Sequence, residues 1–295
     1  MMDRDGFLDR YGNRWLDVDS CLVCAEEDSA CLLKISARDY PFPTDISPAL
    51  LRCRRCDLRW VSPQVVSIAA ENRSSHPGNC GSDEPAVDLT LYRWALEKLG
   101  VYCSAGKLLD VGCGTGRLLK EAQRLGWEAL GIDPSEERTE YARKASGLKV
   151  LTGHLESAGL PAQYYDAVTM TEVLEHLRNP RGLLKEIYRV LKEDGILLIT
   201  TPNPNCLEAL IHRSKWAMFC VATHYNFYSD TTLRRLLSET GYQLQDRITW
   251  VKGSNNVKNI ARYVSSRIGV PFANTHIVIV RKRRQSSIPI SVEGR

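Results

Sequence analysis

The sequence predicts an α/β fold of the Rossmann-like kind, with a mostly parallel seven-stranded sheet, helices on both faces and a small cysteine-rich N-terminal segment. Three observations support this prediction. Strand and helix patterns alternate at short spacing after residue 88, which favours right-handed β-α-β units. A glycine-rich turn joins the first of these strands to a helix. Two Cys-x-x-Cys pairs lie near the N-terminus, where helical signals are few.

Composition divides the chain into four parts. Its 295 residues, 43% hydrophobic and 25% charged, suffice for one domain of ordinary size and a smaller appendage. We expect the cysteine-bearing segment at 1–70, a linker at 71–88, the α/β domain at 89–282 and a frayed basic tail at 283–295. The linker, ENRSSHPGNCGSDEPAVD, is rich in turn-forming residues and has no hydrophobic period.

In the α/β part, short apolar runs predict the strands, and apolar residues recurring every three or four positions predict the helices. The expected strands cover 107–111, 129–132, 148–151, 167–170, 196–200, 242–251 and 276–280. The expected helices cover 91–99, 118–125, 136–145, 183–191 and 233–237, and the fourth is expected to end at Asp194 and Gly195. The run at 196–200 is apolar throughout, which is typical of a strand buried on both faces.

Composition also excludes some classes of protein. No apolar run approaches the ~20 residues that cross a bilayer, and the acidic start MMDRDGFLDR lacks the basic and then apolar pattern of a secretory signal. We therefore expect a cytoplasmic protein without a membrane span. In that reducing compartment the clustered cysteines are expected to hold metal rather than form disulfides. The net charge of +4 does not by itself indicate nucleic-acid binding.

The glycine turn after the first strand favours a ligand other than a pyrophosphate. Dinucleotide-binding turns read G-x-G-x-x-G, whereas this turn has Gly112, Gly114 and Gly116, followed by Arg117 where the third dinucleotide glycine would stand. Asp110 ends the preceding strand, where a carboxylate would repel a pyrophosphate and attract a cation. The sequence therefore predicts a ligand with a positive charge.

A second acid, Asp133, ends the second strand in the segment ALGIDPS. It follows Gly112 by 21 residues, the offset at which a carboxylate accepts hydrogen bonds from both hydroxyls of a ribose in nucleoside-binding α/β folds. A ligand that carries both a ribose and a positive charge matches S-adenosylmethionine (SAM). We therefore expect SAM as the cofactor.

Four segments in order resemble the motifs of class I SAM-dependent methyltransferases, especially the branch that contains ubiquinone-type O-methyltransferases. The segments read DVGCGTG, GIDPS, YYDAVTMTEVLEHL and GILLITTPNPN, and the resemblance covers roughly residues 88 to 250. A glycine turn alone is a weak signal, but four motifs in order, each at the expected strand end, are specific. The resemblance implies a methyltransferase domain over 89–282.

The resemblance also implies cofactor contacts, position by position. Asp110 and the backbone of the three turn glycines would surround the methionine half of SAM, and Asp133 would hold the ribose. After the third strand, family members usually carry an acid for the adenine amino group, in a pattern like G-D-x-E. This chain has His154 in the place of that acid. Adenine recognition would then rest on the Leu155 amide, with Glu156 either nearby or only a surface acid.

The segment after the fourth strand supplies a candidate base. We expect Glu172 to begin a helix there and, by resemblance, to line the cofactor cavity. Methyl transfer from a sulfonium is an in-line displacement, but a poorly acidic acceptor also needs to lose a proton. His176, one expected helical turn beyond Glu172, is a candidate for that role. The sequence equally allows a histidine that only packs and forms hydrogen bonds.

A second candidate base lies in the aromatic segment at 206–228, between the fifth strand and the next helix. Relatives often build a substrate cover at this place. His224 could face a methyl acceptor there, together with Tyr225 and Tyr228. Aromatic side chains in such segments are also frequently part of the core.

The N-terminal segment carries a metal-binding pattern. The pairs Cys21 with Cys24 and Cys53 with Cys56 are two knuckles that together complete a tetrahedral structural zinc site. Four thiolates leave no open position for catalysis, so Zn²⁺ would stabilise the segment. LRCRRCDLRWVSPQ also resembles the segment that precedes the catalytic domain in SAM-dependent methyltransferases with an N-terminal zinc ribbon, several of which act on sugars or other secondary metabolites.

Three functions follow from these patterns. The favoured one is methylation of a small molecule, most plausibly on oxygen of a sugar, a lipid-linked sugar or a natural-product scaffold. A zinc-finger-bearing RNA methyltransferase is a less favoured alternative, kept open by basic residues at 52–55 and 281–284. A non-catalytic adaptor built on the same fold is the third, but it would have no need of the glycine turn and Asp133. The sequence leaves the acceptor and the oligomeric state open.

Overall fold

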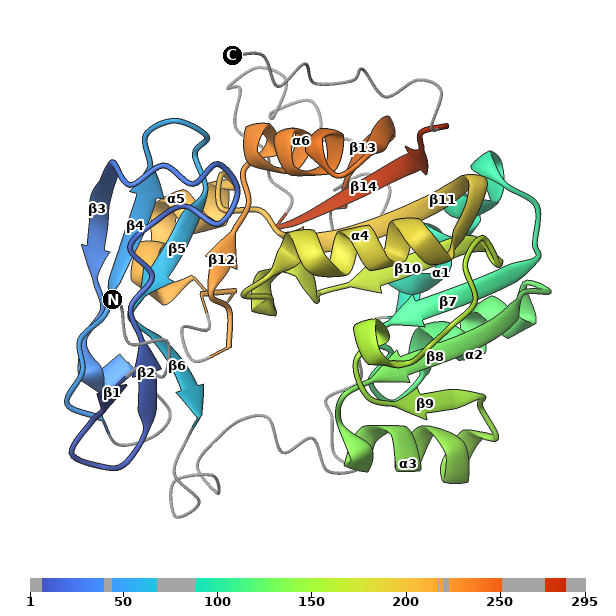
Figure 1. The fold of residues 1–295 in the computed structure, drawn as a ribbon, viewed down its shortest axis with the longest axis horizontal. Coiled ribbons are helices and arrows are strands. Elements are labelled where there is room, and N and C mark those ends of the chain that lie inside the picture. The colour runs from blue at the N-terminus through green and yellow to red at the C-terminus, as the bar shows by residue number, and fades with distance from the viewer. Residues whose placement is uncertain are drawn as a thin grey trace, which may run out of the picture.

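A computed structural model describes residues 7–39, 44–67, 89–216, 218–219, 223–250 and 274–284. The predicted linker at 71–88 and the tail beyond residue 284 lie outside the described residues. Figure 1 shows two parts, with the N-terminal strands on one side and a larger sheet flanked by helices on the other. The described part of the chain contains no helix that is long and apolar enough to span a membrane.

The larger sheet has seven strands in the order β13-β14-β11-β10-β7-β8-β9. The run from β11 to β9 is parallel, and β14 and β13 add antiparallel to its edge. The strands are β7 (Lys107–Val111), β8 (Glu128–Asp133), β9 (Val150–Thr152), β10 (Tyr165–Thr171), β11 (Leu191–Pro202), β13 (Tyr242–Trp250) and β14 (Thr275–Lys282). This arrangement confirms the predicted α/β class with a mostly parallel seven-stranded sheet and helices on both faces.

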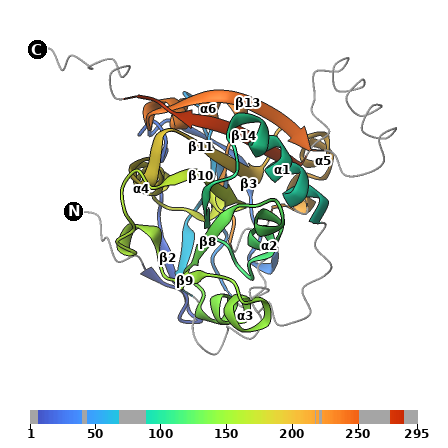
Figure 2. The same ribbon diagram turned by 90° about the vertical axis from the view of Figure 1, so that its right-hand side faces the viewer.

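Helices cover both faces of the sheet, as Figure 2 shows for α2 and α4. One core contains residues of α1 (Leu89–Tyr102), α2 (Arg117–Arg124) and α3 (Glu136–Ser146). The other contains residues of α4 (Pro180–Val190) and α6 (Asp230–Glu239). Three of these helices begin at a polar residue whose side chain accepts a hydrogen bond from a backbone N–H of the first turn. These capping residues are Ser135, Asn179 and Ser229.

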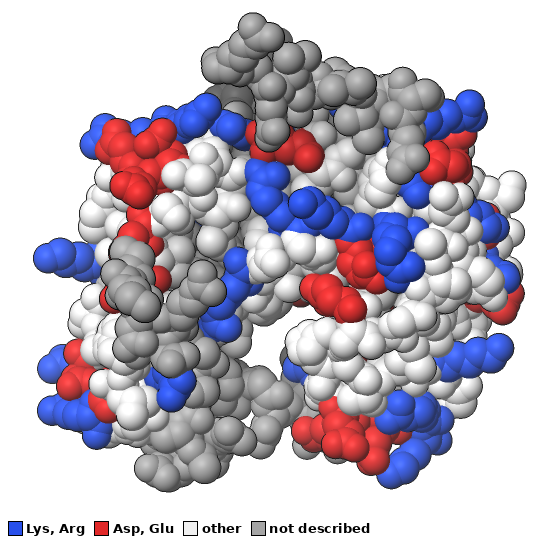
Figure 3. All heavy atoms as spheres, viewed as in Figure 1, with Lys and Arg blue, Asp and Glu red and all other residues white. Residues whose placement is uncertain are grey.

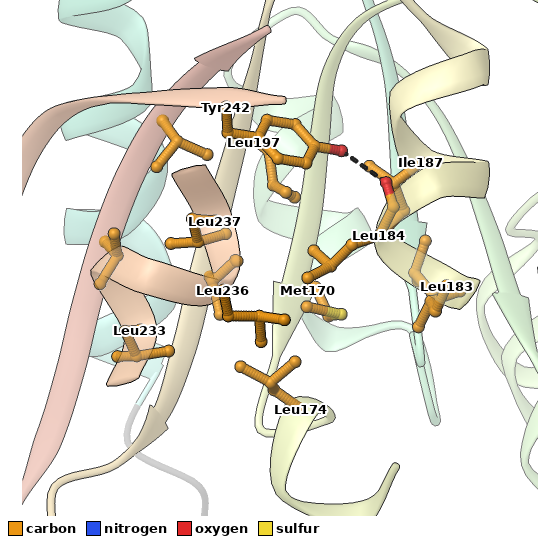
Figure 4. Close-up of a cluster of buried hydrophobic side chains, with 14 of the residues drawn as sticks. Met170, Leu174, Leu183, Leu184, Ile187, Leu197, Leu233, Leu236, Leu237 and Tyr242 are labelled. Atoms are coloured by element: carbon orange, nitrogen blue, oxygen red, sulfur yellow. Dashed lines mark hydrogen bonds between the residues drawn. The ribbon is translucent and has the colours of Figure 1, made fainter. Parts of the chain in front are cut away.

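Leucines from α4 and α6 fill the space between these helices and the sheet (Figure 4). Leu184 and Leu236 are fully buried, and Met170 of β10 lies beneath them. Burial of each such side chain contributes about 1.5–3 kcal/mol. The Tyr242 hydroxyl donates to the Leu184 carbonyl over 2.9 Å, so even the polar atom at the edge of this core has a partner.

The N-terminal part consists of short antiparallel strands. One sheet has the order β1-β2-β6 and the other has the order β12-β5-β4-β3. The strands are β1 (Phe7–Leu8), β2 (Arg14–Leu16), β3 (Ser29–Lys34), β4 (Ala49–Cys53), β5 (Arg59–Ser62), β6 (Gln64–Ser67) and β12 (Asn226–Phe227). Strand β12 comes from the segment between β11 and α6 and pairs with β5. The two parts of the chain are therefore joined by a shared sheet.

Most expected elements are confirmed to within a few residues, and two expectations are wrong. The helix expected through Leu191 ends at Val190, and β11 begins at Leu191 and runs through Asp194. The helix expected to begin at Glu172 is absent from this described segment. Glu172 has a φ of 52°, and only a short 3-10 turn, η4 (Leu174–His176), follows it. A tight turn therefore follows β10 at the sheet edge.

Candidate active site

The glycine turn lies at the carboxyl end of β7. The space around the α-carbon differs among its three glycines. All three have positive φ. A Cβ on Gly112 would lie 2.3 Å from Val173, and one on Gly116 would lie 2.2 Å from Leu148, so both allow close packing. A Cβ on Gly114 would meet no atom within 4 Å. Gly114 therefore borders open space, where the backbone can approach a ligand.

Asp133 lies beside this turn at the end of β8 and is 5% exposed. One carboxylate oxygen accepts from the Gly114 amide over 2.9 Å, and the other accepts from the Ser135 amide over 2.9 Å. Each carboxylate oxygen has two lone pairs, so both can accept a further hydrogen bond. The structure thus brings together two of the predicted cofactor positions and fixes the orientation of the carboxylate.

Asp110 is buried at the end of β7, with 1% exposure. Its carboxylate accepts from the Thr169 hydroxyl of the neighbouring β10 over 2.7 Å. Burial, with a contribution from the charge of Asp133, raises the pKa of Asp110 to about 7, although the Thr169 hydrogen bond opposes the rise. A cation bound nearby would favour the ionised form of this group.

The expected adenine position lies at the end of β9. The Gly153 amide donates to the Asp133 carbonyl over 3.0 Å, which places this segment next to the ribose candidate. His154 is exposed and begins the 3-10 turn η3 (Leu155–Ser157), whereas Leu155 is 2% exposed and packs in the core. Glu156 is exposed.

Glu172 follows β10 with a left-handed backbone that costs of order 1–3 kcal/mol for a residue other than glycine. The Thr200 hydroxyl donates to Glu172 Oε1 over 2.9 Å. Glu172 Oε2 is buried without a hydrogen-bond partner, and burial raises the pKa of this carboxyl. A strained acid with one buried carboxylate oxygen at the carboxyl edge of a parallel sheet is typical of a ligand site.

A second acid, Glu175, is fully buried in η4. Its Oε2 accepts from the Thr201 hydroxyl over 2.9 Å, whereas Oε1 is buried without a hydrogen-bond partner. Burial, together with the charge of Glu172, raises its pKa well above the ordinary value. Glu175 Oε1 lies 3.9 Å from Nε2 of His176, and the Glu175 carboxyl also interacts with that of Glu172.

The two predicted histidine candidates lie side by side. Their ring centroids are 4.7 Å apart and their planes meet at 79°. His176 Nδ1 lies 2.7 Å from the Thr223 carbonyl, and His224 Nδ1 lies 2.7 Å from the Met218 carbonyl. Because a carbonyl only accepts, each Nδ1 carries the proton and each Nε2 keeps its lone pair.

Burial also keeps these rings neutral. It lowers the pKa of His176, and it lowers the pKa of His224 to about 4, with a smaller contribution from the charge of His176. One ligand atom from each of Glu175, His176 and His224 lies within 4.8 Å of the others. The cluster can therefore accept a proton, and its donor types would also suit a divalent cation.

The four predicted metal ligands form a second cluster in the N-terminal part. Their sulfur atoms lie within 4.8 Å of one another, with Cys21 and Cys56 3.4 Å apart and Cys24 and Cys53 also 3.4 Å apart. Four thiolates at the Zn–S distance of tetrahedral zinc would lie ~3.8 Å apart, so the cluster fits the ion.

The residue after each cysteine pair has the backbone conformation that usually favours glycine. Ala25 has a φ of 56° and Asp57 has a φ of 66°. The same cluster packs against the catalytic part of the chain. Cys21, Cys53 and Cys56 share a core with Leu233 and Leu236 of α6.

Comparison with known families identifies the fold and its class of activity. Residues 89–246, which contain the glycine turn, Asp133, Glu172 and both histidines, match the family described as a methyltransferase domain. The chain belongs to this methyltransferase family. It is therefore a class I SAM-dependent methyltransferase, as the motifs predicted.

Curated relatives of the chain include ubiquinone biosynthesis O-methyltransferases. The chain is 36% identical to the mitochondrial ubiquinone biosynthesis O-methyltransferase of Schizosaccharomyces pombe, over 37% of this chain and 43% of that protein. It is 30% identical to the ubiquinone biosynthesis O-methyltransferase of Dinoroseobacter shibae, over 48% of this chain and 61% of that protein. The chain thus spans less than two thirds of the length of these relatives.

Solved structures support the fold. A SAM-dependent methyltransferase from Archaeoglobus fulgidus matches with a TM-score of 0.50 and 22% identity, over 65% of this chain and 93% of that one. A SAM-dependent methyltransferase from Mesorhizobium loti also has a TM-score of 0.50, with 16% identity, over 65% of this chain and 98% of that one. At this identity the likeness concerns the fold alone.

Sequence reasoning missed the hydroxyl groups that support the buried acids. Thr169 donates to Asp110, Thr200 to Glu172 and Thr201 to Glu175. The only available signal was the position of these threonines at or near the ends of two buried strands, where a hydroxyl is unusual in an apolar run.

Proposed function

We propose that this methyltransferase transfers the methyl group of SAM to a hydroxyl oxygen of a small molecule, in the class of sugars, lipid-linked sugars or natural-product scaffolds. The observation that carries the proposal is the pair of neutral histidines, His176 and His224, beside the buried Glu175 and the partly buried Glu172. They lie at the edge of the sheet where open α/β folds bind their ligands. An alcohol is too weak an acid to attack without losing its proton, and this cluster offers a base.

The chain's residues would hold the cofactor in the following way. Asp133 would accept from the ribose hydroxyls, and the open face of Gly114 would let the backbone approach the methionine half, near Asp110. His154 and Leu155, at the end of β9, would border the adenine. Glu172 would close the cavity at the end of β10. When bound, SAM supplies an electrophilic methyl group on a sulfonium.

His176 is the proposed base. Its side chain is 39% exposed, so an acceptor can reach it, and its Nδ1–H donates to Thr223, which directs the Nε2 lone pair away from that carbonyl. Nε2 would take the proton of the acceptor hydroxyl as the oxygen forms its bond to the methyl carbon. His224 would hold the imidazole of His176 in place by edge-to-face packing.

Two further observations support a small acceptor. The curated relatives are named as O-methyltransferases, although they are matched over only part of their length. On the face that Figure 3 shows, positive and negative side chains are interspersed over the described surface. An RNA-binding face would concentrate cations along one stripe.

The N-terminal part would be a zinc ribbon that supports the catalytic domain. We propose that residues 1–70 form this unit around Zn²⁺ held by Cys21, Cys24, Cys53 and Cys56, and that residues 89–282 form the methyltransferase domain. The metal would act structurally, because four thiolates complete its coordination.

Acceptor screening tests the proposal. The protein is incubated with methyl-labelled SAM and a panel of sugars, lipid-linked sugars and phenolic or polyketide alcohols, and products are measured by mass spectrometry. The expected result is a gain of one methylene on a hydroxyl oxygen of one class, with no gain on RNA. Transfer to RNA with a steep dependence on salt, or transfer to nitrogen or carbon, would contradict it. The variant His176→Gln is expected to bind SAM normally and to lose transfer.

A further inference from the structure

A separate cavity of about 370 Å³ lies between the N-terminal sheet and the segment that follows β11. Its walls come from β3, β4 and β5 on one side and from the helix α5 (Leu207–His212) and the turn η5 (Arg213–Lys215) on the other. Such a volume matches the pockets that hold small molecules. None of the residues proposed to hold SAM lines it. The cavity is therefore distinct from the proposed cofactor site.

One wall of the cavity is aromatic. Phe219 stacks on Phe227 with ring centroids 5.3 Å apart, and Trp216 lies 6.1 Å from the same ring. Leu32, Leu33, Leu50, Ala209 and Leu210 complete the apolar lining. Leu32 is 44% exposed and Leu210 is 49% exposed. This lining offers an apolar ring or chain a surface to bury.

The polar side chains of the cavity are all hydrogen-bond donors. They belong to Arg52, Arg59, Arg213 and Trp216, and none of the described residues that line the cavity is acidic. The indole Nε1 of Trp216 is buried without a hydrogen-bond partner, in a side chain that is only 4% exposed. A buried donor of this kind costs about 1–3 kcal/mol when unpaired in the protein alone. A ligand with acceptor atoms would satisfy it.

Two of the three cations form no ion pair among the described residues. Arg52 forms an ion pair with Asp57. Arg59 instead donates to the Pro204 carbonyl over 2.9 Å and to the Asn205 side chain, both of which are neutral, and its Nε is buried without a partner. Arg213 forms no ion pair within the described ranges and has a φ of 51°, in the left-handed region. Asp57, which pairs with Arg52, also interacts electrostatically with Arg59. The cavity thus combines an apolar wall with three cations and one nearby acid.

We propose that this cavity binds a small amphipathic anion, in which an aromatic or alkyl body carries a carboxylate or phosphate group. The body would lie against Phe227 and Trp216, and the anionic group would accept hydrogen bonds from Arg59, Arg213 and the Trp216 indole. The Phe227 ring lies 6.4 Å from the ring of His224, so the ligand would sit one aromatic layer away from the proposed base.

A matched pair of fluorescent probes tests the charge requirement. 1-Anilinonaphthalene-8-sulfonate carries an anion on an apolar body, and N-phenyl-1-naphthylamine has the same rings without the charge. Titration of the full chain is expected to show one site for the sulfonate, with an affinity at least about tenfold above that of the neutral probe. Equal affinity for the two probes would overturn the proposal.

Substitution of a lining arginine tests whether the sulfonate binds in this cavity. Arg213→Gln is expected to weaken sulfonate binding about tenfold and to leave the neutral probe unchanged. Arg124→Gln, at the exposed end of α2, serves as the matched control and is expected to change neither affinity. An Arg213→Gln protein that binds the sulfonate as tightly as the wild type would overturn the proposal.

A substitution that fills the cavity with a side chain provides a second, independent test of the binding site. Ala209→Phe places a ring in the cavity and is expected to abolish binding of both probes, while circular dichroism and SAM binding stay as in the wild type. Undiminished binding of the sulfonate by a folded Ala209→Phe protein would contradict the assignment. Because SAM binding is measured separately, failure of this proposal is distinguishable from failure of the proposed function.

The same cavity also allows the source of the natural ligand to be determined. Anionic metabolites that displace the sulfonate are identified by mass spectrometry and then incubated with the protein and SAM. A displacing compound that gains one methylene is the methyl acceptor itself, and one that is unchanged is a separate effector. Both outcomes support an amphipathic-anion site. Displacement by neutral or cationic compounds alone would overturn it.

Discussion

The rings of His176 and His224 meet edge to face, with centroids 4.7 Å apart, although the two residues lie 48 positions apart in the sequence. Each ring donates through Nδ1 to a main-chain carbonyl, and this leaves two Nε2 lone pairs in one place. The arrangement makes the turn after β10 and the segment before β12 a single structural unit. Substitution of one histidine is therefore expected to change the position of the other ring.

Loss of the proposed base is expected to reduce turnover strongly. His176→Gln should lower kcat by about 10²–10⁴ while the affinity for SAM stays unchanged, because a general base contributes in this range. His212→Gln, which alters an exposed histidine of α5, is the control and should retain wild-type turnover. A His176→Gln enzyme with full turnover would show that the imidazole only packs.

The pH dependence of turnover follows from the lowered pKa of His176. The base acts in its neutral form, and burial lowers its pKa, so the neutral form persists to lower pH than for an exposed histidine. The rate is therefore expected to fall only as the pH drops below 6.5, the ordinary value for histidine. A profile of kcat/KM against pH measures this midpoint. A midpoint above that value would contradict partly desolvated His176 as the base.

Alanine substitutions at two glycines distinguish the loss of a cofactor contact from the cost of backbone strain. Gly114 and Gly147 both have positive φ, and a Cβ on either would meet no atom within 4 Å. Alanine at each position should therefore cost a similar ~1–2 kcal/mol in the free energy of unfolding. Only Gly114→Ala is expected to weaken SAM binding, by about tenfold or more, because Gly114 faces the proposed cofactor space. Equal SAM affinity in the two variants would refute that placement.

Metal content tests the cysteine cluster. The wild type is expected to contain one zinc ion per chain, and Cys56→Ser should lose it, whereas Cys31→Ser should keep it because Cys31 is exposed and outside the cluster. Since Cys56 shares a core with Leu233 of α6, loss of the metal should also lower the Tm of the catalytic part. Elemental analysis and calorimetry measure both. Wild-type protein free of zinc after expression with zinc would contradict the ribbon.

A buried histidine in β14 predicts a pH dependence of stability. His276 is 3% exposed, and burial lowers its pKa to about 4 from the ordinary value of 6.5. Between these values the unfolded chain binds more protons than the folded chain, so acidification favours unfolding. The stability that depends on neutral His276 is fully present above pH 6.5 and is lost toward pH 4, by about 3 kcal/mol.

The variant His276→Phe isolates this effect. The difference in the free energy of unfolding between wild type and variant is expected to change by that amount between pH 7 and pH 4, in the direction of a less stable wild type at low pH. Other groups cancel in the difference. A constant difference across the range would rule out His276 as the origin.

The sheet and the residues at its edge could be predicted from the sequence, because both depend on short-range patterns. The apolar run at 107–111 became β7 without a change of bounds, and Asp133 lies beside Gly114 because parallel strands end at the same edge. Helix periodicity was less informative after β10. The backbone of Glu172 takes a left-handed conformation there, which no propensity favours and which tertiary contacts with Thr200 impose.

Long-range pairings could not be predicted. Strand β12 joins the N-terminal sheet across 166 positions, from Asn226 back to Trp60, and nothing in either segment indicates the partner. The donor-lined cavity has the same origin, because Arg59 and Arg213 are brought together only by that pairing and the packing of α5. The contact of His176 with His224 likewise depends on a fold that places two loops together.

Isothermal titration with SAM tests the central claim most directly, with Asp133→Asn as the variant. Asparagine keeps the size of the side chain and one acceptor oxygen for the backbone amides but removes the charge and half of the acceptor capacity. We expect the wild type to bind one SAM per chain and the folded variant to bind at least about tenfold more weakly. Equal affinities in the two proteins, or no binding by the wild type, would contradict a cofactor site built on this aspartate and the adjacent glycine turn.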